Sequence, residues 1–168
     1  MRKPARREKS SIATPPVPAP VPVPGEGKRG VEGHLGYLLR QAAAAQRAKT
    51  ERALADLGVT PPQFAVLTML NAYPGISNAD TARLSLLTPQ TVSVIVGNLE
   101  KAGWIGRRPH EIHGRIQHID LTASGRRVLA QCRQRIGRLE PRMTAGLSAG
   151  EEKIVRRWLV DLARDDAG

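Results

Sequence analysis

The sequence predicts a mainly α-helical protein with one small β-hairpin, arranged as a winged helix-turn-helix between N-terminal and C-terminal helices. Apolar residues recur at helical spacing through most of the chain, which predicts amphipathic helices. In the centre, a short helical segment, a brief turn and a second helical segment with a polar outer face follow one another. Directly after them, two short segments alternate apolar and polar residues, as the strands of a hairpin do.

The length of 168 residues fits one domain of ordinary size plus a tail. Residues 1–30 carry seven of the thirteen prolines and almost no large apolar side chain. Such a segment cannot bury enough surface to offset the entropy of ordering, so we expect a disordered tail with polyproline II bias. Its basic residues suit either an arm that follows phosphates or a solvated tail that aids solubility. The single domain is expected over residues 31–168.

The charge balance points to an anionic partner. The formal net charge is +11 and the isoelectric point is near 11.0, which favours nucleic acid first, an anionic membrane second and a merely soluble basic protein third. The single cysteine, Cys132, excludes an intramolecular disulfide framework and a multi-thiolate metal site. No apolar run is long enough to span a bilayer, and the prolines after the basic start are incompatible with a helical signal segment. We therefore expect a cytoplasmic protein.

The first two helices have clear boundaries in the sequence. Helical periodicity begins at Leu35, and Gly58 is placed to end that long first helix. Thr60 is a predicted N-cap, followed by proline and by Gln63 at the position that completes a capping box. This second helix is expected to end near residues 73–75.

A short third helix is predicted by the same kind of start. Ser77 is the expected cap, and Asp80 is placed to bond back to it. We expect this helix to turn Ala79, Ala82 and Leu84 inward. A three-residue link, residues 85–87, then leads to the next helix.

The stretch TPQTVSVIVGNLEKAG, residues 88–103, is ambiguous by propensity because its β-branched middle alternates like a half-buried strand. Thr88 with its following proline gives a helix start, and Gly103 stands where a helix-ending glycine belongs. Apolar residues fall at i, i+3, i+4 and i+7, namely at Val92, Ile95, Val96 and Leu99. We therefore predict a helix with one buried face. Gly97 inside it costs about 1 kcal/mol relative to alanine, and close approach to another surface is one candidate reason.

After Gly103 the period changes. Residues 104–108 and 117–121 read as two strands of a β-hairpin, with Ile119 and Leu121 turned inward. A long helix is expected from Thr122, with its seam at Leu129, Cys132, Ile136, Leu139 and Met143. Ser148 and Glu151 form a predicted capping box for the final helix, whose stripe is Ile154, Val155, Trp158, Leu159 and Leu162.

This arrangement predicts contact with DNA, because a major groove admits a helix and the helix start favours a neighbouring phosphate. The outer face of the helix over residues 88–101 offers Gln90, Thr91, Ser93, Val94, Gly97 and Lys101. The hairpin brings three arginines together with only Glu111 among the acids, and an arginine at a loop tip suits the narrow minor groove. The candidate DNA contacts are Thr88, Gln90, Thr91, Ser93, Val94, Lys101, Arg107, Arg108 and Arg115.

Four segments together resemble the MarR (multiple-antibiotic-resistance regulator) family of bacterial transcription factors. They are LTPQTVSVIVGNLEKAGWIGRRP, the hairpin RRPHEIHGRIQHIDLT, its following ASGRR, and LSAGEEK before the last helix. The resemblance spans about residues 35–165. It implies a recognition helix at residues 88–102, a wing-tip arginine at Arg115 that enters the minor groove, and a winged helix-turn-helix over residues 58–122. It also implies a homodimer joined through residues 31–57 and 123–166.

The resemblance further implies a ligand pocket between the dimer helices and each winged domain, for which Tyr37 and Phe64 are candidate lining residues, with core packing as the alternative role. The expected function is a sequence-specific, dimeric DNA-binding regulator, a repressor released by a small ligand and associated with the nucleoid when bound. A nonspecific architectural or RNA-binding protein is the rival, and a protein–protein module on the same fold is a third reading.

Two departures from the family pattern stand out. The wing of the family usually has an aspartate followed by two arginines, whereas this chain has His113, Gly114 and Arg115, so the acid that braces the wing arginine is missing. Val94 stands where many relatives carry a polar or basic side chain, which favours an apolar contact with a thymine methyl group.

The remaining candidate sites have simpler readings. His110, His113 and His118 could bind a metal, but no carboxylate or thiolate shell accompanies them, so a solvated basic loop is favoured. Protonation of His113 would add positive charge near DNA, a pH effect that we keep as a hypothesis. Cys132 lies on an apolar seam, where cysteine acts as a small hydrophobe rather than a redox sensor. No catalytic motif is present, so we expect neither an enzyme nor a bound cofactor.

Overall fold

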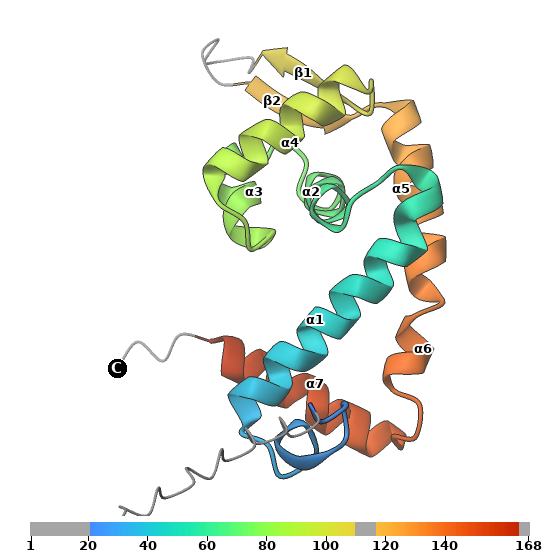
Figure 1. Ribbon diagram of the computed structural model, residues 1–168. Coiled ribbons are helices and arrows are strands. Elements are labelled where there is room, and N and C mark those ends of the chain that lie inside the picture. The colour runs from blue at the N-terminus through green and yellow to red at the C-terminus, as the bar shows by residue number, and fades with distance from the viewer. Residues whose placement is uncertain (1–20, 110–116, 165–168) are drawn as a thin grey trace, which may run out of the picture. The chain divides into compact units, whose positions relative to one another are not determined.

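The computed structural model describes residues 21–109 and 117–164 (Figure 1). The chain forms two compact units, residues 1–42 and residues 43–168. The first unit contains the 3-10 turn η1 (Gly27–Arg29) and the start of helix α1 (Leu35–Leu54). Within this unit, Arg29 Nε donates to Gln41 Oε1 at 2.7 Å. Residues 21–30, which the sequence places in a disordered tail, therefore contain a turn that is fastened to α1, while residues 1–20 lie outside the described residues.

In the second unit, α1 ends in the 3-10 turn η2 (Ala55–Leu57), and Gly58 follows in the left-handed conformation with φ of 63°. Glycine adopts this conformation without the steric cost that a Cβ brings. Helix α2 (Pro61–Ala72) then starts at the predicted capping box, with both the Thr60 and the Gln63 bonds formed. The predicted ends of the first two helices are confirmed.

Helix α3 (Asn78–Leu84) begins at the predicted cap, where the Ser77 side chain accepts from the Asp80 backbone N–H. Its buried residues are Thr81 and Ala82. The expectation that Ala79 and Leu84 point inward is wrong, because both are exposed, Leu84 at 43%. The buried Thr81 satisfies its hydroxyl by donating to the Ser77 carbonyl at 2.8 Å, so a polar residue can occupy the inward position.

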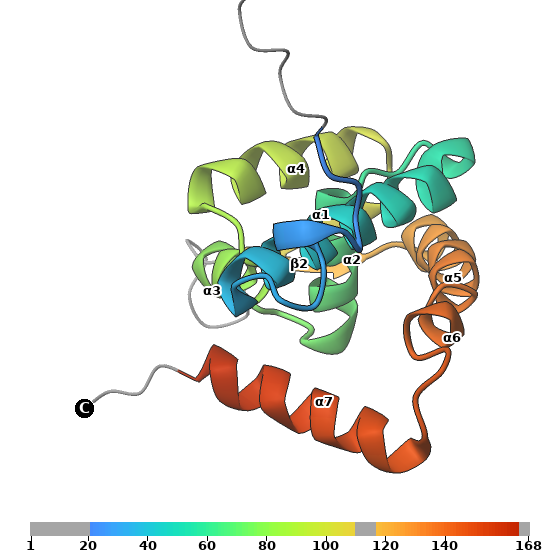
Figure 2. The same ribbon diagram turned by 60° about the horizontal axis from the view of Figure 1, so that its bottom comes forward.

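Helix α4 (Pro89–Lys101) resolves the ambiguity of the β-branched stretch in favour of a helix. The residues predicted for its buried face are all buried, and they are Val92, Ile95, Val96 and Leu99. Helices α3 and α4 lie side by side in both views (Figures 1 and 2). Burial of this stripe outweighs the small helix penalty of valine and isoleucine.

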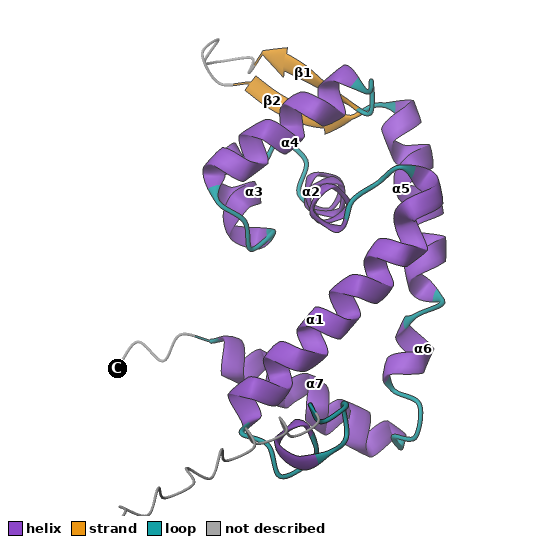
Figure 3. Ribbon diagram, viewed as in Figure 1, coloured by secondary structure: helices purple, strands orange, loops and turns teal. Residues whose placement is uncertain are grey.

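The hairpin joins β1 (Ile105–Pro109) to β2 (Gln117–Leu121) in antiparallel register, with Ile105 opposite Leu121. They are the only strands in the described part of the chain (Figure 3). Ile119 and Leu121 are buried, as predicted. The hairpin, α2, α3, α4 and α5 (Ala123–Gly137) share one apolar core.

The predicted long helix after Thr122 is wrong in its length. Helix α5 ends at Gly137, and a separate short helix, α6 (Glu140–Met143), follows. Pro141 explains the break, because proline has no N–H to donate to the Gly137 carbonyl and its ring collides with that group. The expected seam is buried at Leu129 and Cys132 but 55% exposed at Met143.

The final helix, α7 (Ala149–Ala163), starts at the predicted capping box, in which Ser148 and Glu151 bond to each other reciprocally. None of its residues is buried within the described chain. Among the described residues, no single helix is both long and apolar enough to cross a bilayer, and only Leu35–Leu57 taken together with Pro61–Ala72, across a sharp bend, meets that criterion.

Candidate nucleic-acid interface

The turn between α3 and α4 is tight and strained. Leu87 N–H donates back to the Ala82 carbonyl at 2.9 Å, which closes the turn. Leu86 has a φ of 55°, the only positive φ of a described residue other than glycine, and it is 93% exposed. A side chain in this conformation costs roughly 1–2 kcal/mol. The sequence reading missed this feature because a leucine gives no signal of a left-handed backbone.

The start of α4 is held by hydroxyl groups. Thr88 Oγ1 accepts from the Thr91 N–H at 3.1 Å and lies 2.8 Å from Thr91 Oγ1. Ser93 Oγ donates to the Pro89 carbonyl at 3.0 Å. The exposed side chain of Gln90 makes no hydrogen bond with a described residue, so its amide is available to a partner from outside the chain. An amide of this kind can donate to and accept from a base edge at once.

The outward face of α4 carries three of the predicted DNA contacts, Gln90, Val94 and Lys101. Gln90, Val94, Gly97 and Lys101 follow at i, i+4, i+7 and i+11, opposite the buried stripe. Val94 is 61% exposed, and Gln90 and Lys101 are also exposed. The side chains of this face are therefore long and polar at both ends, at Gln90 and Lys101, and short and apolar in the middle, at Val94 and Gly97.

The hairpin contributes a cation that the helix partly neutralises. Arg107 Nε donates to Glu100 Oε2 at 3.0 Å, and both side chains are about 40% exposed. The sequence reading counted only Glu111 near the hairpin arginines, and Glu100 corrects it. That pairing was missed because it joins the end of α4 to β1 around a turn. The Arg108 side chain, Glu111 and Arg115 lie outside the described residues.

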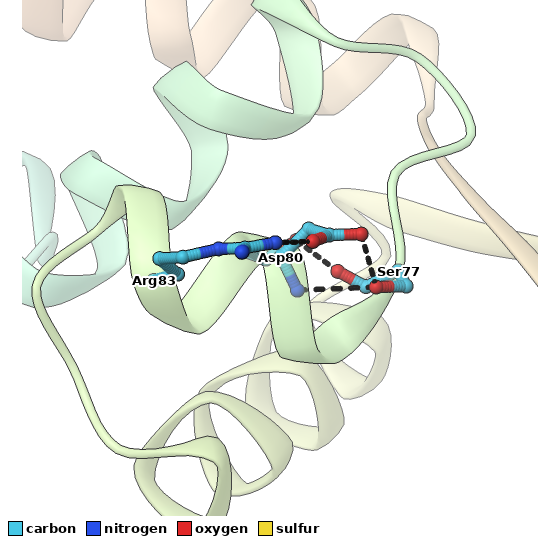
Figure 4. A network of polar contacts seen from close by, with 4 residues as sticks. Ser77, Asp80 and Arg83 are labelled. Atoms are coloured by element: carbon cyan, nitrogen blue, oxygen red, sulfur yellow. Dashed lines mark hydrogen bonds and ion pairs between the residues drawn. The ribbon is translucent and has the colours of Figure 1, made fainter.

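A polar network fixes the start of α3 (Figure 4). Ser77 Oγ donates to Asp80 Oδ2 at 2.7 Å, and Arg83 forms an ion pair with Asp80 Oδ1. The hydrogen bond from Ser77, followed by that from Arg83, lowers the pKa of the Asp80 carboxyl below its usual value. The Arg83 side chain stays 77% exposed. It remains accessible to a phosphate near the helix-turn-helix.

The histidines do not form the cluster that a metal requires within the described residues. His118 on β2 is half-buried, and its Nδ1 lies 3.2 Å from the Gly75 carbonyl at the turn after α2. His110 and His113 lie outside the described residues. The described part of the chain contains no group of three or more metal-ligating side chains. His118 instead fastens the hairpin to the α2–α3 turn.

Cys132 lies within an apolar cluster of α1, α5 and the segment between α1 and α2. It is fully buried beside Leu54 and Val59, and burial raises the pKa of its thiol. A buried, protonated thiol is a poor nucleophile. The structure thus supports its reading as a small hydrophobe.

Two hollows lie in the second unit. One, of about 380 Å³, is lined by Lys49, Arg52, Ala53, Leu139 and Arg142. The other, of about 500 Å³, is lined by Leu70, Asn71, Pro74, Asp120, Leu121 and Arg126. Neither contains the predicted pocket residues. Tyr37 belongs to the first unit and is 39% exposed, whereas Phe64 is partly buried against the core of the second unit, so their shared role stays a prediction.

Comparison with known proteins gives one consistent result. Residues 57–116 match the model of the MarR family. The HTH-type transcriptional repressor Rv2887 of Mycobacterium tuberculosis (strain ATCC 25618 / H37Rv) is 35% identical over 131 residues, which cover 78% of this chain and 94% of that protein. Among solved structures, Rv2887 in complex with DNA aligns with a TM-score of 0.65 at 32% identity, covering 79% of this chain and 100% of that one. The complex of Rv2887 with salicylic acid aligns with a TM-score of 0.64 at 34% identity, covering 79% and 98%.

Proposed function

The chain belongs to the MarR family and is a DNA-binding transcriptional regulator; we propose that it acts as a homodimeric repressor that a small ligand releases from its operator. The observation that carries this proposal is α4. The four apolar side chains of one face are buried, while the opposite face is exposed and mostly polar, with Val94 as its apolar side chain. A helix of this kind is suited to lie in a major groove.

In this proposal the start of α4 reads bases. Gln90 supplies an amide that is free of described partners, and Thr91 and Ser93 supply hydroxyl groups beside it. Thr88 caps the helix by accepting from the Thr91 N–H, and Pro89 has no N–H, so the Gln90 N–H and the positive end of the helix dipole remain for an approaching phosphate. Val94 meets a thymine methyl group, and Lys101 meets the opposite phosphate strand.

The hairpin acts as the wing. Arg107 is positioned by Glu100 at the base of β1, and Arg108 follows on the same strand. Arg115 lies outside the described residues, and we assign it to the minor groove on the family resemblance. An arginine there gains from the negative potential of a narrow groove.

In this proposal a second copy of the chain completes the DNA-binding unit. The apolar stripe of α7 is 40–58% exposed in a single chain, and a partner subunit that covers it removes this surface from water. Two recognition helices roughly 34 Å apart would reach successive major-groove faces of an imperfect palindrome.

The releasing ligand is assigned by chemistry. The relative Rv2887 is known in complex with salicylic acid, and this chain has a hollow where Lys49, Arg52 and Arg142 face the apolar Ala53 and Leu139. Three cations beside an apolar wall suit a small organic acid. Tyr37 and Phe64 do not line this hollow, and they stay predictions that rest on the family resemblance alone. The ligand acts by binding the DNA-free arrangement better than the bound one.

The family is one of regulators rather than catalysts, and we assign this chain no enzymatic activity. We place its action in the cytoplasm, on the nucleoid when it is bound to DNA.

The test begins with selection of bound fragments from the source genome, which yields the operator. Gln90→Ala is expected to weaken operator binding by about 5- to 100-fold, since a bidentate base contact is worth about 1–3 kcal/mol, and to change binding to random DNA little. Gln134→Ala, an exposed glutamine on α5, is the matched control and should bind like the wild type.

Arg115→Ala separates the two kinds of contact. It is expected to lower affinity for all sequences and to reduce the salt dependence, because it removes a charge near phosphates. Equal losses on operator and random DNA for Gln90→Ala would favour the nonspecific architectural or RNA-binding rival. Failure of the wild type to bind DNA even at low salt would favour a protein–protein module.

A further inference from the structure

Gly97 is unexplained by the chain in which it lies. It stands inside α4, eight residues after the first residue of the helix and four before the last. Glycine in a helix interior costs roughly 1 kcal/mol relative to alanine. Its backbone does not call for glycine, because Gly97 is not among the glycines with a positive φ.

Packing within the protein does not call for glycine either. A Cβ built on Gly97 meets nothing within 4 Å among the described residues, apart from its own helix backbone and chain neighbours. Gly125 in α5 is the contrast, because a Cβ there would collide with the Trp104 carbonyl. Packing within the chain thus explains Gly125 and does not explain Gly97.

The position of Gly97 indicates what it leaves room for. It lies in the centre of the outward face, one turn after Val94 and one turn before Lys101. With the exposed Val94 beside it, Gly97 makes the outward face short and apolar between the longer side chains of Gln90 and Lys101. In a major groove the one apolar group on a base edge is the 5-methyl group of thymine.

We propose that Gly97 and Val94 together seat a thymine methyl group of the operator, and that the missing side chain of Gly97 sets how deeply α4 enters the groove. This inference rests on the proposed function and adds a residue that determines specificity. Gly97 contributes no hydrogen bond. It acts by leaving space where any other residue would place at least a methyl group.

The first experiment replaces Gly97 by alanine. Gly97→Ala is expected to raise the midpoint of thermal unfolding, since alanine is the better helix former, and to weaken operator binding about tenfold, the effect of overfilling a close contact. Gly97→Gln, which is larger, is expected to weaken it further. A merely tolerated glycine would give the higher midpoint with unchanged affinity and would overturn the proposal.

Asn71→Ala is the matched control, because Asn71 is exposed on α2, alanine is again the better helix former, and the position lies outside both α4 and the helices assigned to the dimer. It is expected to leave operator affinity unchanged while both variants remain dimers by sedimentation. Equal losses for Gly97→Ala and Gly97→Gln would indicate that the helix needs flexibility rather than space, and would also overturn the proposal.

The second experiment changes the DNA. Deoxyuridine lacks the thymine methyl group, so we replace each thymine of an operator half-site in turn. At one position, loss of the thymine methyl group is expected to weaken binding of the wild type several-fold. The same DNA change should restore most of the affinity that Gly97→Ala loses, because the thymine methyl group no longer competes with the alanine methyl group for one space. Additive effects at every position would contradict the inference.

These outcomes are separate from failure of the proposed function. If the wild type selects no operator, the proposed function fails. If the wild type binds its operator and Gly97→Ala binds it equally well, the proposed function stands and only the proposed role of Gly97 fails.

Discussion

Helices α4 and α7 carry the same apolar pattern and reach opposite states in a single chain. Both begin at a Ser or Thr cap and repeat apolar residues at three- and four-residue spacing. In α4 the stripe is 0–7% exposed, whereas in α7 the stripe is 40–58% exposed. The apolar spacing therefore predicts that one face of the helix is buried, but it does not predict whether the same chain or a partner buries that face.

The difference follows from what each helix has within its own chain. Helix α4 lies against α3, α2 and β1, which share its core. The stripe of α7 joins neither apolar core of the described residues. A large exposed apolar stripe on a charged helix marks a protein interface, which agrees with a homodimer. The core of the chain covers the apolar stripe of α4, and we propose that a partner subunit covers that of α7.

The largest expected effect is on α4. Leu99→Ala removes a fully buried side chain and should reduce the free energy of unfolding by about 2–5 kcal/mol, at every protein concentration. Val94→Ala, at an exposed position of the same helix, should change it by less than about 0.5 kcal/mol. Urea denaturation followed by circular dichroism measures both. Similar losses for the two variants would show that the face of α4 is assigned wrongly.

The next effect is on α7. Trp158→Ala removes the largest side chain of the exposed stripe and should weaken dimerisation by about 2–4 kcal/mol, roughly 30- to 1,000-fold. Sedimentation at several concentrations measures it, and the monomer should keep its helical signal. Lys153→Ala, on the opposite side of α7, is the control. An unchanged dimer for Trp158→Ala would move the interface away from α7.

The smallest effect distinguishes the two helix starts. Helix α7 is capped through the Glu151 carboxylate, whose pKa is lowered by its hydrogen bonds with Ser148, whereas α4 is capped through hydroxyl groups. A carboxyl with a lowered pKa in the folded state stabilises it above the unfolded pKa, and this contribution is lost as the pH falls through the folded value.

Wild type and Glu151→Gln should therefore differ in unfolding midpoint at neutral pH, and the difference should shrink as the pH falls through the lowered pKa of Glu151, because glutamine does not titrate. Thermal unfolding between pH 7 and pH 3.5 tests this. A constant difference across that range would mean that the Glu151 charge does not contribute to the cap.

Much of the fold was predictable because its signals are local. The caps at Thr60, Ser77, Thr88 and Ser148 depend on residues within one turn of each helix start, and the structure has all four. The stripe of α4 was predictable because its spacing fits a helix over its full length. The break before α6 could also have been predicted from Pro141. It was missed because the apolar spacing continues past Pro141 to Met143, as in a single long helix.

The candidate site was less accessible to sequence reasoning. The outward residues of α4 followed from its buried stripe by elimination. The Glu100 and Arg107 pair depends on how the turn between α4 and β1 is folded, and the His118 contact with Gly75 joins residues that are 43 positions apart. The left-handed backbone at Leu86 could not be predicted, because leucine does not favour that conformation. Ala79 and Leu84 were misplaced because a seven-residue helix is too short for periodicity to fix its buried side.

The sequence by itself determined the order of the elements, their caps and the two apolar faces, because spacing, hydroxyl caps, glycine and proline act through the nearest few residues. Tertiary structure decided which of those faces is covered within the chain, which acid meets Arg107, and which glycine is required by packing. Those outcomes depend on contacts that form only when the chain folds, and for α7 and Gly97 we propose that a partner subunit and DNA supply the contacts.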